Sequence, residues 1–151
     1  MPGRAGEKNR PVLGIGVDLV ENKRMKEALE KWGDAFKEKV FLPGEWAYCD
    51  SKAQAWHHYA GRFAVKEAVS KAFGTGVSEH IGWLDIEVVR DPKTGAPSVR
   101  LSNKGLRLAR RKKVGDVLVS LSHTRNYAVA QALLVSGGSL QQKGRRTNSG
   151  R

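Results

Sequence analysis

The sequence predicts an α+β fold, a single compact domain that combines a small antiparallel sheet with one long central helix. Three observations support this prediction. Apolar runs typical of strands lie near both ends of the chain, the longest helical pattern lies between them, and two strand-like runs joined by a turn follow that helix. The length of 151 residues is that of about one domain, and no internal repeat is visible. The predicted element order is therefore β, α, α, α, β, β, α, β, β within one domain.

The first predicted element is the strand PVLGIGVDLV, residues 11–20. Because side chains alternate between the two faces of a strand, Gly14, Gly16 and Asp18 share one face. Glycine within a strand marks a place where another backbone or a ligand comes close. We expect the opposite, apolar face to belong to the core. It consists of Leu13, Ile15, Val17 and Leu19.

Shorter helices are predicted directly after this strand. One covers 21–33 and ends at Gly33, a residue suited to a helix C-cap, and a short helical piece near 34–40 adjoins it. Another helix runs from Pro43 toward Ser51, since proline is favoured in the first turn.

The longest predicted helix runs from about Lys52 to Phe73 and ends at Gly74. At about 100° per residue, one stripe of this helix faces inward. That stripe consists of Trp56, Ala60, Phe63, Glu67 and Ser70. Glu67 therefore lies where a core residue is expected, and its carboxylate needs a partner there.

The second half of the chain is predicted to form a hairpin, a helix and two more strands. The runs 83–91 and 96–102 flank the turn-rich stretch PKTG, a pattern typical of a hairpin. The basic segment 103–113 has a helical pattern, and 116–135 has that of two strands joined by a turn at 124–126.

The net charge of +12 is unevenly distributed along the chain. Segments 1–10 and 138–151 carry half of it, with seven basic residues against one acidic residue. Both ends are also rich in Gly, Ser, Asn and Gln and lack apolar periodicity, so we expect disordered basic tails there. The folded domain is then predicted to cover 11–137.

The composition also excludes two classes of protein. No stretch approaches the ~18 uninterrupted apolar residues of a membrane span, so we expect a cytoplasmic protein without a membrane partner. Cys49 is the only cysteine, which excludes an internal disulfide and a cysteine-rich zinc site.

Asp18 and Glu67 are two carboxylates that are predicted to point into partly apolar surroundings. Two such groups repel each other unless a positive charge lies between them. Mg²⁺ fits a pair of oxygen ligands without cysteine or a histidine cluster, and it commonly shares its coordination shell with substrate phosphates. Lys66 and Lys71 lie near Glu67 and are available for those phosphates. These residues therefore predict a site that handles phosphoryl groups.

Each of these residues also fits a purely structural role. Asp18 and Glu21 have the spacing of a helix capping box, and Glu67 and Lys71 have that of an i,i+4 salt bridge. The glycine turn after the long helix can be a simple helix terminus, and His123 at a strand end can be structural.

Three motifs together resemble a known family. GIGVDLVE at 14–21, FAVKEAVSKAFGTG at 63–76 and SLSHTRNYAVAQALL at 120–134 are similar, in order and separation, to motifs of holo-(acyl-carrier-protein) synthases. These enzymes are the small class of 4′-phosphopantetheinyl transferases. The resemblance covers about residues 11–135, and it implies the 4′-phosphopantetheinyl transferase fold.

The resemblance implies a reaction as well. Similar enzymes transfer the phosphopantetheine group of coenzyme A (CoA) to a serine of an acyl carrier protein and release adenosine 3′,5′-bisphosphate. Asp18 and Glu67 are then expected to bind Mg²⁺ together with the CoA pyrophosphate. Lys71 is our candidate for the phosphate that is attacked, and Lys66 is the second choice. The acceptor of the serine proton stays open between a water on the metal, Glu67 and Asp18.

Further residues match family positions that bind the nucleotide or the carrier. The nucleotide set consists of Arg62, Gly74, Thr75, Ser122, His123 and Thr124. The carrier set consists of Lys23, Arg24, Met25 and Lys26. A basic helix would attract an acidic carrier protein, although without the resemblance it would be a solvated surface. The resemblance also implies that Gly14 and Gly16 keep the neighbouring face open, and that the chain forms a homotrimer with active sites at subunit boundaries.

The alternative to a phosphopantetheinyl transferase is a basic nucleic-acid-binding module without catalysis. The net charge and the basic segment 103–113 favour this alternative. The aromatic residues Trp56, Phe63 and Phe73 argue against this alternative. They lie on the helix that is predicted to be buried, and they do not interleave with the basic run. We therefore expect no specific nucleic-acid partner.

Overall fold

The computed structural model describes residues 9–137, and most of the two predicted tails, 1–8 and 138–151, lie outside these residues. The chain has the expected α+β architecture, and the predicted element order is confirmed. The elements are β1 (Val12–Glu21), α1 (Asn22–Val40), α2 (Pro43–Asp50), α3 (Ala55–Ala72), β2 (Ile86–Arg90), β3 (Pro97–Leu101), α4 (Asn103–Arg111), β4 (Val114–His123) and β5 (Tyr127–Ser136). One turn of 3-10 helix, Trp83–Asp85, precedes β2.

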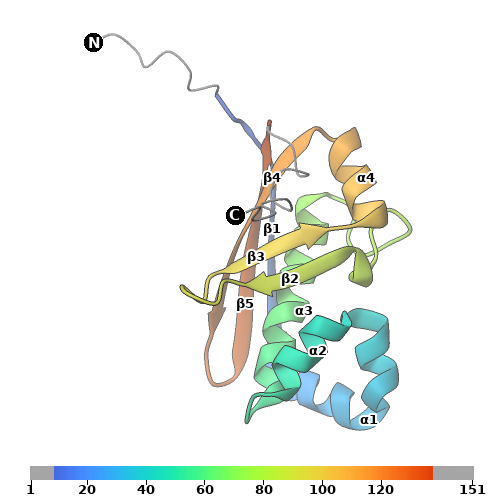
Figure 1. Cartoon of the computed structure of the whole chain (residues 1–151), viewed down its shortest axis with the longest axis vertical. Helices are drawn as coiled ribbons and strands as arrows, with labels where there is room; N and C mark the ends of the chain where they lie inside the picture. Colours follow the sequence, from blue (N-terminus) through green and yellow to red (C-terminus); the bar gives the residue numbers. More distant parts are fainter. Residues whose placement is uncertain (1–8, 138–151) are drawn as a thin grey trace, which may run out of the picture.

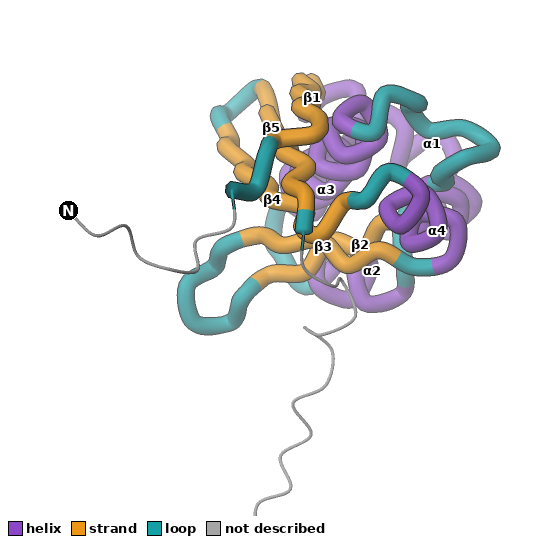
Figure 2. Tube along the Cα trace, turned by 90° about the horizontal axis from the view of Figure 1, so that it is seen from above, coloured by secondary structure: helices purple, strands orange, loops and turns teal. Residues whose placement is uncertain are grey.

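Two antiparallel sheets are arranged around α3. The larger sheet has the strand order β1-β5-β4, and the smaller sheet pairs β2 with β3. α3 packs across the larger sheet, β3 contacts β4, and α1 and α2 pack against α3 at the lower end of the view (Figure 1). Figure 2 shows the described helices on one side of the larger sheet, so no element within 9–137 covers its other face.

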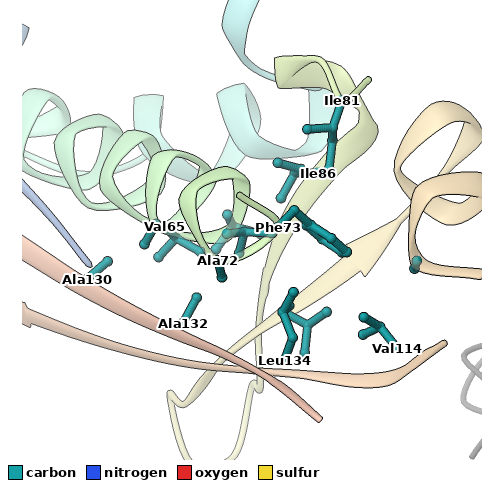
Figure 3. Packing of buried hydrophobic residues seen from close by; sticks show 14 of the residues in the cluster. Val65, Ala72, Phe73, Ile81, Ile86, Val114, Ala130, Ala132 and Leu134 are labelled. Carbon is teal, nitrogen blue, oxygen red and sulfur yellow. The ribbon is translucent and has the colours of Figure 1, made fainter. Parts of the chain in front are cut away.

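The core lies between α3 and the inner face of the larger sheet (Figure 3). Both surfaces carry small side chains at the contact. Those of α3 include Ala64, Ala68 and Ala72, and those of β5 include Ala130 and Ala132. Small residues on both sides let the helix lie close to the sheet while the packing stays dense.

Gly14 and Gly16 extend this close contact onto β1. A Cβ atom at Gly16 would lie 1.9 Å from the carbonyl oxygen of Ala68, and one at Gly14 would lie 2.1 Å from that of Ala72. Glycine in a strand can make room for another backbone or for a ligand. At Gly14 and Gly16 it makes room for the backbone of α3. The expectation that these glycines keep the face open is therefore wrong, because α3 occupies it.

The other face of β1 was expected to belong to the core, and this prediction is also wrong. Ile15 and Leu19 are each 62 % exposed, and Val17 is 57 % exposed. Leu118 of β4 and Val129 of β5 are exposed as well, so an apolar surface crosses the outside of the larger sheet. We call this surface the outer sheet face; it consists of Leu13, Ile15, Val17, Leu19, Leu118 and Val129.

Glycine and proline set the helix boundaries near the predicted places. The helical pieces predicted at 21–33 and 34–40 form one element, α1, which is interrupted at Gly33 with φ +53° and ψ −133°. α2 begins at Pro43 as predicted, and α3 starts a few residues later than predicted and ends before Gly74, whose φ is +80°. Within residues 9–137 we find no helix that combines the length and apolar character needed to cross a bilayer.

Candidate active site

Asp18 and Glu67 line the same hollow, which we call the carboxylate hollow. It has a volume of about 460 Å³ and lies between β1, α1 and α3. Asp18 is on the inner face of β1, where its side chain is only 14 % exposed, and Glu67 projects from the middle of α3. The contact between α3 and the glycine face of β1 brings these two carboxylates to one place, as the sequence predicted.

Lys71 lies one turn after Glu67 and pairs with the other carboxylate. Its Nζ donates to Asp18 Oδ1 at 2.8 Å and to the carbonyl oxygen of Val17 at 3.2 Å. The alternative of a salt bridge between Glu67 and Lys71 is therefore wrong. The capping-box alternative is wrong as well, because Asp18 lies inside β1 and the N-cap of α1 is Glu21, without a side-chain cap.

The charges in the carboxylate hollow are not balanced. Burial raises the pKa of Glu67, the nearby Asp18 raises it further, and Lys71 opposes this shift. The hydrogen bond to Asp18 raises the pKa of Lys71. Glu21 and Arg24 also line the hollow, so three carboxylates lie near two basic groups, and an additional cation would relieve the repulsion that remains.

Asp18 and Glu67 fit a Mg²⁺ ion as a pair of oxygen ligands. The described residues contain no group of three or more His, Cys, Asp or Glu side chains that could hold a metal. Mg²⁺ is commonly held by one or two carboxylates, while waters and substrate phosphates complete its shell. Asp18 and Glu67 therefore suit Mg²⁺ better than a metal ion whose ligands must all come from protein side chains.

The predicted carrier set lies on α1 beside this hollow. Arg24 and Met25 line it, but Met25 is only 4 % exposed and belongs to a second apolar cluster that includes Cys49 of α2 and Tyr59 of α3. Lys23 and Lys26 are exposed on the helix surface, where Lys26 Nζ lies 4.6 Å from the centroid of the Trp56 ring. Of this set, Arg24 is the residue that is both exposed and at the hollow.

Lys66 does not reach the carboxylate hollow. Its side chain is completely buried, and Nζ donates to Glu45 Oε1 at 2.7 Å and to the carbonyl oxygen of Trp83 at 3.0 Å. Burial lowers the pKa of Lys66, and the ion pair with Glu45 opposes this shift. Glu45 also accepts hydrogen bonds from the backbone N–H groups of Leu42 and Val88. This buried ion pair joins α2, α3 and β2, and it gives Lys66 a structural contact in place of the expected phosphate.

Arg62 and His123 meet in a second hollow of about 280 Å³, which we call the basic hollow. His123 lies close to α3 because position 61 is glycine; a Cβ there would lie 2.6 Å from His123 Cε1. The basic hollow and the carboxylate hollow have no lining residue in common.

The remaining nucleotide-set residues line neither hollow. Ser122 and Thr124 flank His123 and are exposed, and the carbonyl of Thr124 accepts a hydrogen bond from Asn22 Nδ2 at 3.2 Å. Gly74 and Thr75 follow the end of α3.

Several residues of the two hollows were not predicted from the sequence. Glu21, Phe36, Phe63 and Tyr127 line the carboxylate hollow. Tyr48, His58 and Arg90 line the basic hollow. They come from elements far apart in the chain, and no local spacing connects them, although the adjacent pair of histidines before Arg62 could have drawn attention to His58.

Comparison with known proteins identifies the family. The sequence model of the 4′-phosphopantetheinyl transferase superfamily matches residues 14–132. A holo-[acyl-carrier-protein] synthase of Ruminiclostridium cellulolyticum is 45% identical over 130 residues, which are 85% of this chain and 96% of that protein.

Two similar solved structures were determined as complexes. The holo-(acyl-carrier-protein) synthase of Bacillus anthracis in complex with CoA (3′,5′-ADP) has a TM-score of 0.69 and 34% identity, covering 83% of this chain and 98% of that one. The synthase of Helicobacter pylori in complex with coenzyme A has a TM-score of 0.71 and 30% identity, covering 80% and 98%.

The fold and the paired carboxylates thus occur together with a family match over most of the chain. The chain belongs to the 4′-phosphopantetheinyl transferase superfamily. The predicted resemblance is confirmed, including its fold.

Proposed function

We propose that this chain transfers the 4′-phosphopantetheine group of CoA to a serine of an apo acyl carrier protein, as a holo-(acyl-carrier-protein) synthase. The observation that carries this proposal is the carboxylate hollow, where Asp18 and Glu67 meet beside Lys71. Similar proteins with known structures or curated names, such as those of Ruminiclostridium cellulolyticum and Bacillus anthracis, are named for this activity. The proposal places the chain in fatty acid biosynthesis in the cytoplasm.

Asp18 and Glu67 would hold Mg²⁺, which would neutralise charge on the CoA pyrophosphate when bound. Lys71 donates to Asp18 in the free chain and its side chain is 48 % exposed, so its ammonium would be accessible to a phosphate oxygen of the bound substrate. The chain's own contribution is to hold the β-phosphorus in line with the carrier serine and to offset charge on the transferred group. The product that leaves is adenosine 3′,5′-bisphosphate.

The carrier protein is proposed to dock on α1. Arg24 lies at the carboxylate hollow, and Lys23 and Lys26 are exposed on the same helix. Opposite charges increase the rate at which an acidic carrier meets this helix, and salt weakens that attraction. Raising the salt concentration should therefore weaken binding of the carrier much more than binding of CoA, and equal salt sensitivity would contradict this docking site.

We also propose that the chain acts as a homotrimer with active sites at subunit boundaries. The outer sheet face is apolar and exposed in the single chain, and such a surface is typical of an interface between subunits. The carboxylate and basic hollows are separate on one chain. Joining the carboxylate hollow of one copy to the basic hollow of its neighbour would give CoA one continuous site.

Mass spectrometry of an apo acyl carrier protein tests the reaction. After incubation with this chain, CoA and Mg²⁺, the carrier should gain the mass of one phosphopantetheine group, and chelation of the metal should prevent the gain. An unmodified carrier under conditions in which the chain is folded and binds CoA would overturn the proposed function.

A further inference from the structure

Asn22 is a buried polar residue at the point where β1 passes into α1. It is the first residue of α1 and is only 2 % exposed. It lies directly between Glu21, which lines the carboxylate hollow, and Lys23, the first residue of the carrier set. Because a buried amide without partners destabilises a fold, the hydrogen bonds of Asn22 indicate what this side chain does here.

Asn22 fastens the turn between β4 and β5 to the start of α1. Its Nδ2 donates to the carbonyl oxygens of Thr124 at 3.2 Å and Arg125 at 3.1 Å. Its backbone N–H donates to the carbonyl oxygen of Asn126 at 2.9 Å. The first residue of α1 thus holds the whole turn, 124–126.

This turn connects the two hollows. His123 ends β4 and lines the basic hollow, and Tyr127 begins β5 and lines the carboxylate hollow. The strand pairing ends at these same two residues, so it does not fix 124–126. Asn22 therefore supplies a link between the turn and the carrier helix that the sheet does not supply.

The energetics favour a functional reason for this amide over a structural one. The Oδ1 of Asn22 is buried without a hydrogen-bond partner among the described residues, and such an acceptor costs stability. Thr124 and Arg125 are exposed, so their carbonyl groups could bind water if the amide were absent. The turn also closes on itself, since the Thr124 N–H donates to the carbonyl oxygen of Tyr127 at 2.8 Å. The fold does not require this amide, and what Asn22 adds is a fixed position of the turn.

We propose that Asn22 is a positioning residue for CoA, which holds the turn so that His123 and Thr124 stay in place for the nucleotide. This inference rests on the proposed function, because it takes the turn as part of the CoA site. A turn that is held in advance loses less conformational freedom when the ligand binds, and this strengthens binding. Asn22 therefore acts on the affinity for CoA, and not on the chemical step or on docking of the carrier.

Steady-state kinetics and calorimetric titration test this assignment. Asn22→Ala removes the amide without adding bulk, and the loss of its two hydrogen bonds to the turn, partly replaced by water, should raise the KM and the Kd for CoA about fivefold. The kcat and the KM for the carrier should stay within about twofold of the unmodified chain. Hydrogen exchange of the backbone N–H groups in the turn should become faster.

Asn22→Asp is the second variant. It keeps the shape of the side chain but directs carboxylate oxygens at the carbonyl groups of Thr124 and Arg125, so the KM for CoA should rise further than in Asn22→Ala.

Asn126→Ala is the matched control. Asn126 is an exposed asparagine of the same turn, and its side chain forms no hydrogen bond within residues 9–137. Its carbonyl oxygen, which accepts from the Asn22 N–H, remains in the variant. Asn126→Ala should therefore leave the KM for CoA unchanged.

Two results would overturn the inference, and they differ from failure of the proposed function. A lower melting temperature of Asn22→Ala with unchanged affinity for CoA would mean that Asn22 serves only the fold. An equal rise in the KM for CoA and for the carrier would mean a general disturbance of the site. Phosphopantetheine transfer by the unmodified chain would still stand in both cases.

If the unmodified chain transfers no phosphopantetheine, the proposed function fails, and the CoA titrations of the variants still decide the role of Asn22. A chain that binds no CoA would overturn both.

Discussion

At the scale of single residues, Glu67 and Lys71 determine the charge balance at the proposed cation site. Glu67 is held near Asp18 at an energetic cost, which its raised pKa reflects. Lys71 reduces part of that cost through its hydrogen bond to Asp18. At Glu67, the proposed catalytic role and the stability of the chain therefore oppose each other.

Glu67→Gln should abolish transfer and also stabilise the metal-free chain at pH 7. A carboxyl whose folded-state pKa is raised stabilises the fold only when protonated, and this stability is lost as the pH rises through that pKa. The neutral amide avoids the loss, and because solvent screens a partly exposed group, the gain should be only about 0.5 kcal/mol. Thermal unfolding should show a higher melting temperature at pH 7 and no gain at a pH low enough to protonate Glu67. Full activity or lower stability of the variant at pH 7 would contradict this role.

Lys71→Gln should tighten binding of a divalent cation to the chain in the absence of CoA. The substitution removes the ammonium that occupies Asp18 Oδ1. Mn²⁺ binding measured by electron paramagnetic resonance should become about fivefold tighter or more, while CoA binding weakens. Arg24→Gln removes one positive charge from the same hollow without touching Asp18, so it should have a smaller effect on Mn²⁺. Equal effects of the two substitutions would mean that Lys71 acts only through its overall charge.

At the scale of elements, the contact between β1 and α3 places both carboxylates. Gly16 lets α3 approach so closely that Asp18, two residues further along β1, lies beside Glu67. The strand and the helix thus form the site through their backbones as much as through their side chains.

Gly16→Ala should destabilise the fold by about 3 kcal/mol or more, since the added Cβ would overlap a backbone carbonyl that cannot move alone. Chemical denaturation should show a lower midpoint. Gly44→Ala at the start of α2 is the control, because no atom lies within 4 Å of a Cβ added there. Similar midpoints for Gly16→Ala and the unmodified chain would contradict the close packing of α3 on β1.

The sequence predicts the elements well because their signals are local. Gly33, Pro43 and Gly74 mark helix boundaries through their own backbone preferences. The alternation of small and large apolar residues along β1 correctly assigned them to two faces of the strand. It contains no information about which of these faces α3 covers. The partner of Lys66 was missed for a similar reason, because Glu45 lies on another helix and only the fold brings the two together.

The candidate site was predictable to the extent that its residues lie within motifs. Asp18 and Glu67 were paired by the family resemblance and by the chemistry of two inward carboxylates, and the structure brings them to one hollow. Tyr48 and Arg90 belong to no motif, so their contact with Arg62 could be found only from the coordinates.

At the scale of the whole molecule, the outer sheet face is the feature that a single chain leaves unexplained. A trimer would bury its apolar side chains, which are costly to expose to water. Figure 2 shows that the face is free of other described elements, so a neighbouring copy has access to it.

Ile15→Glu should convert the proposed trimer into monomers without unfolding the chain. Ile15 is 62 % exposed in the single chain, so a charge there costs little until the face is covered. Analytical ultracentrifugation should show the loss of the larger species, and circular dichroism should remain unchanged. Leu84→Glu, at an exposed apolar residue of the 3-10 helix, should leave the assembly intact. An unmodified chain that sediments as a monomer would rule out the trimer.

The shared cation of Asp18 and Glu67 is the central claim, and Mn²⁺ binding in the presence of CoA measures it most directly. The unmodified chain should bind one Mn²⁺ per chain, and Asp18→Asn and Glu67→Gln should each weaken that binding by about a hundredfold, since each removes one of two charged ligands. Retention of the unmodified affinity by either variant, in a chain that remains folded and binds CoA, would contradict a metal site shared by these two carboxylates.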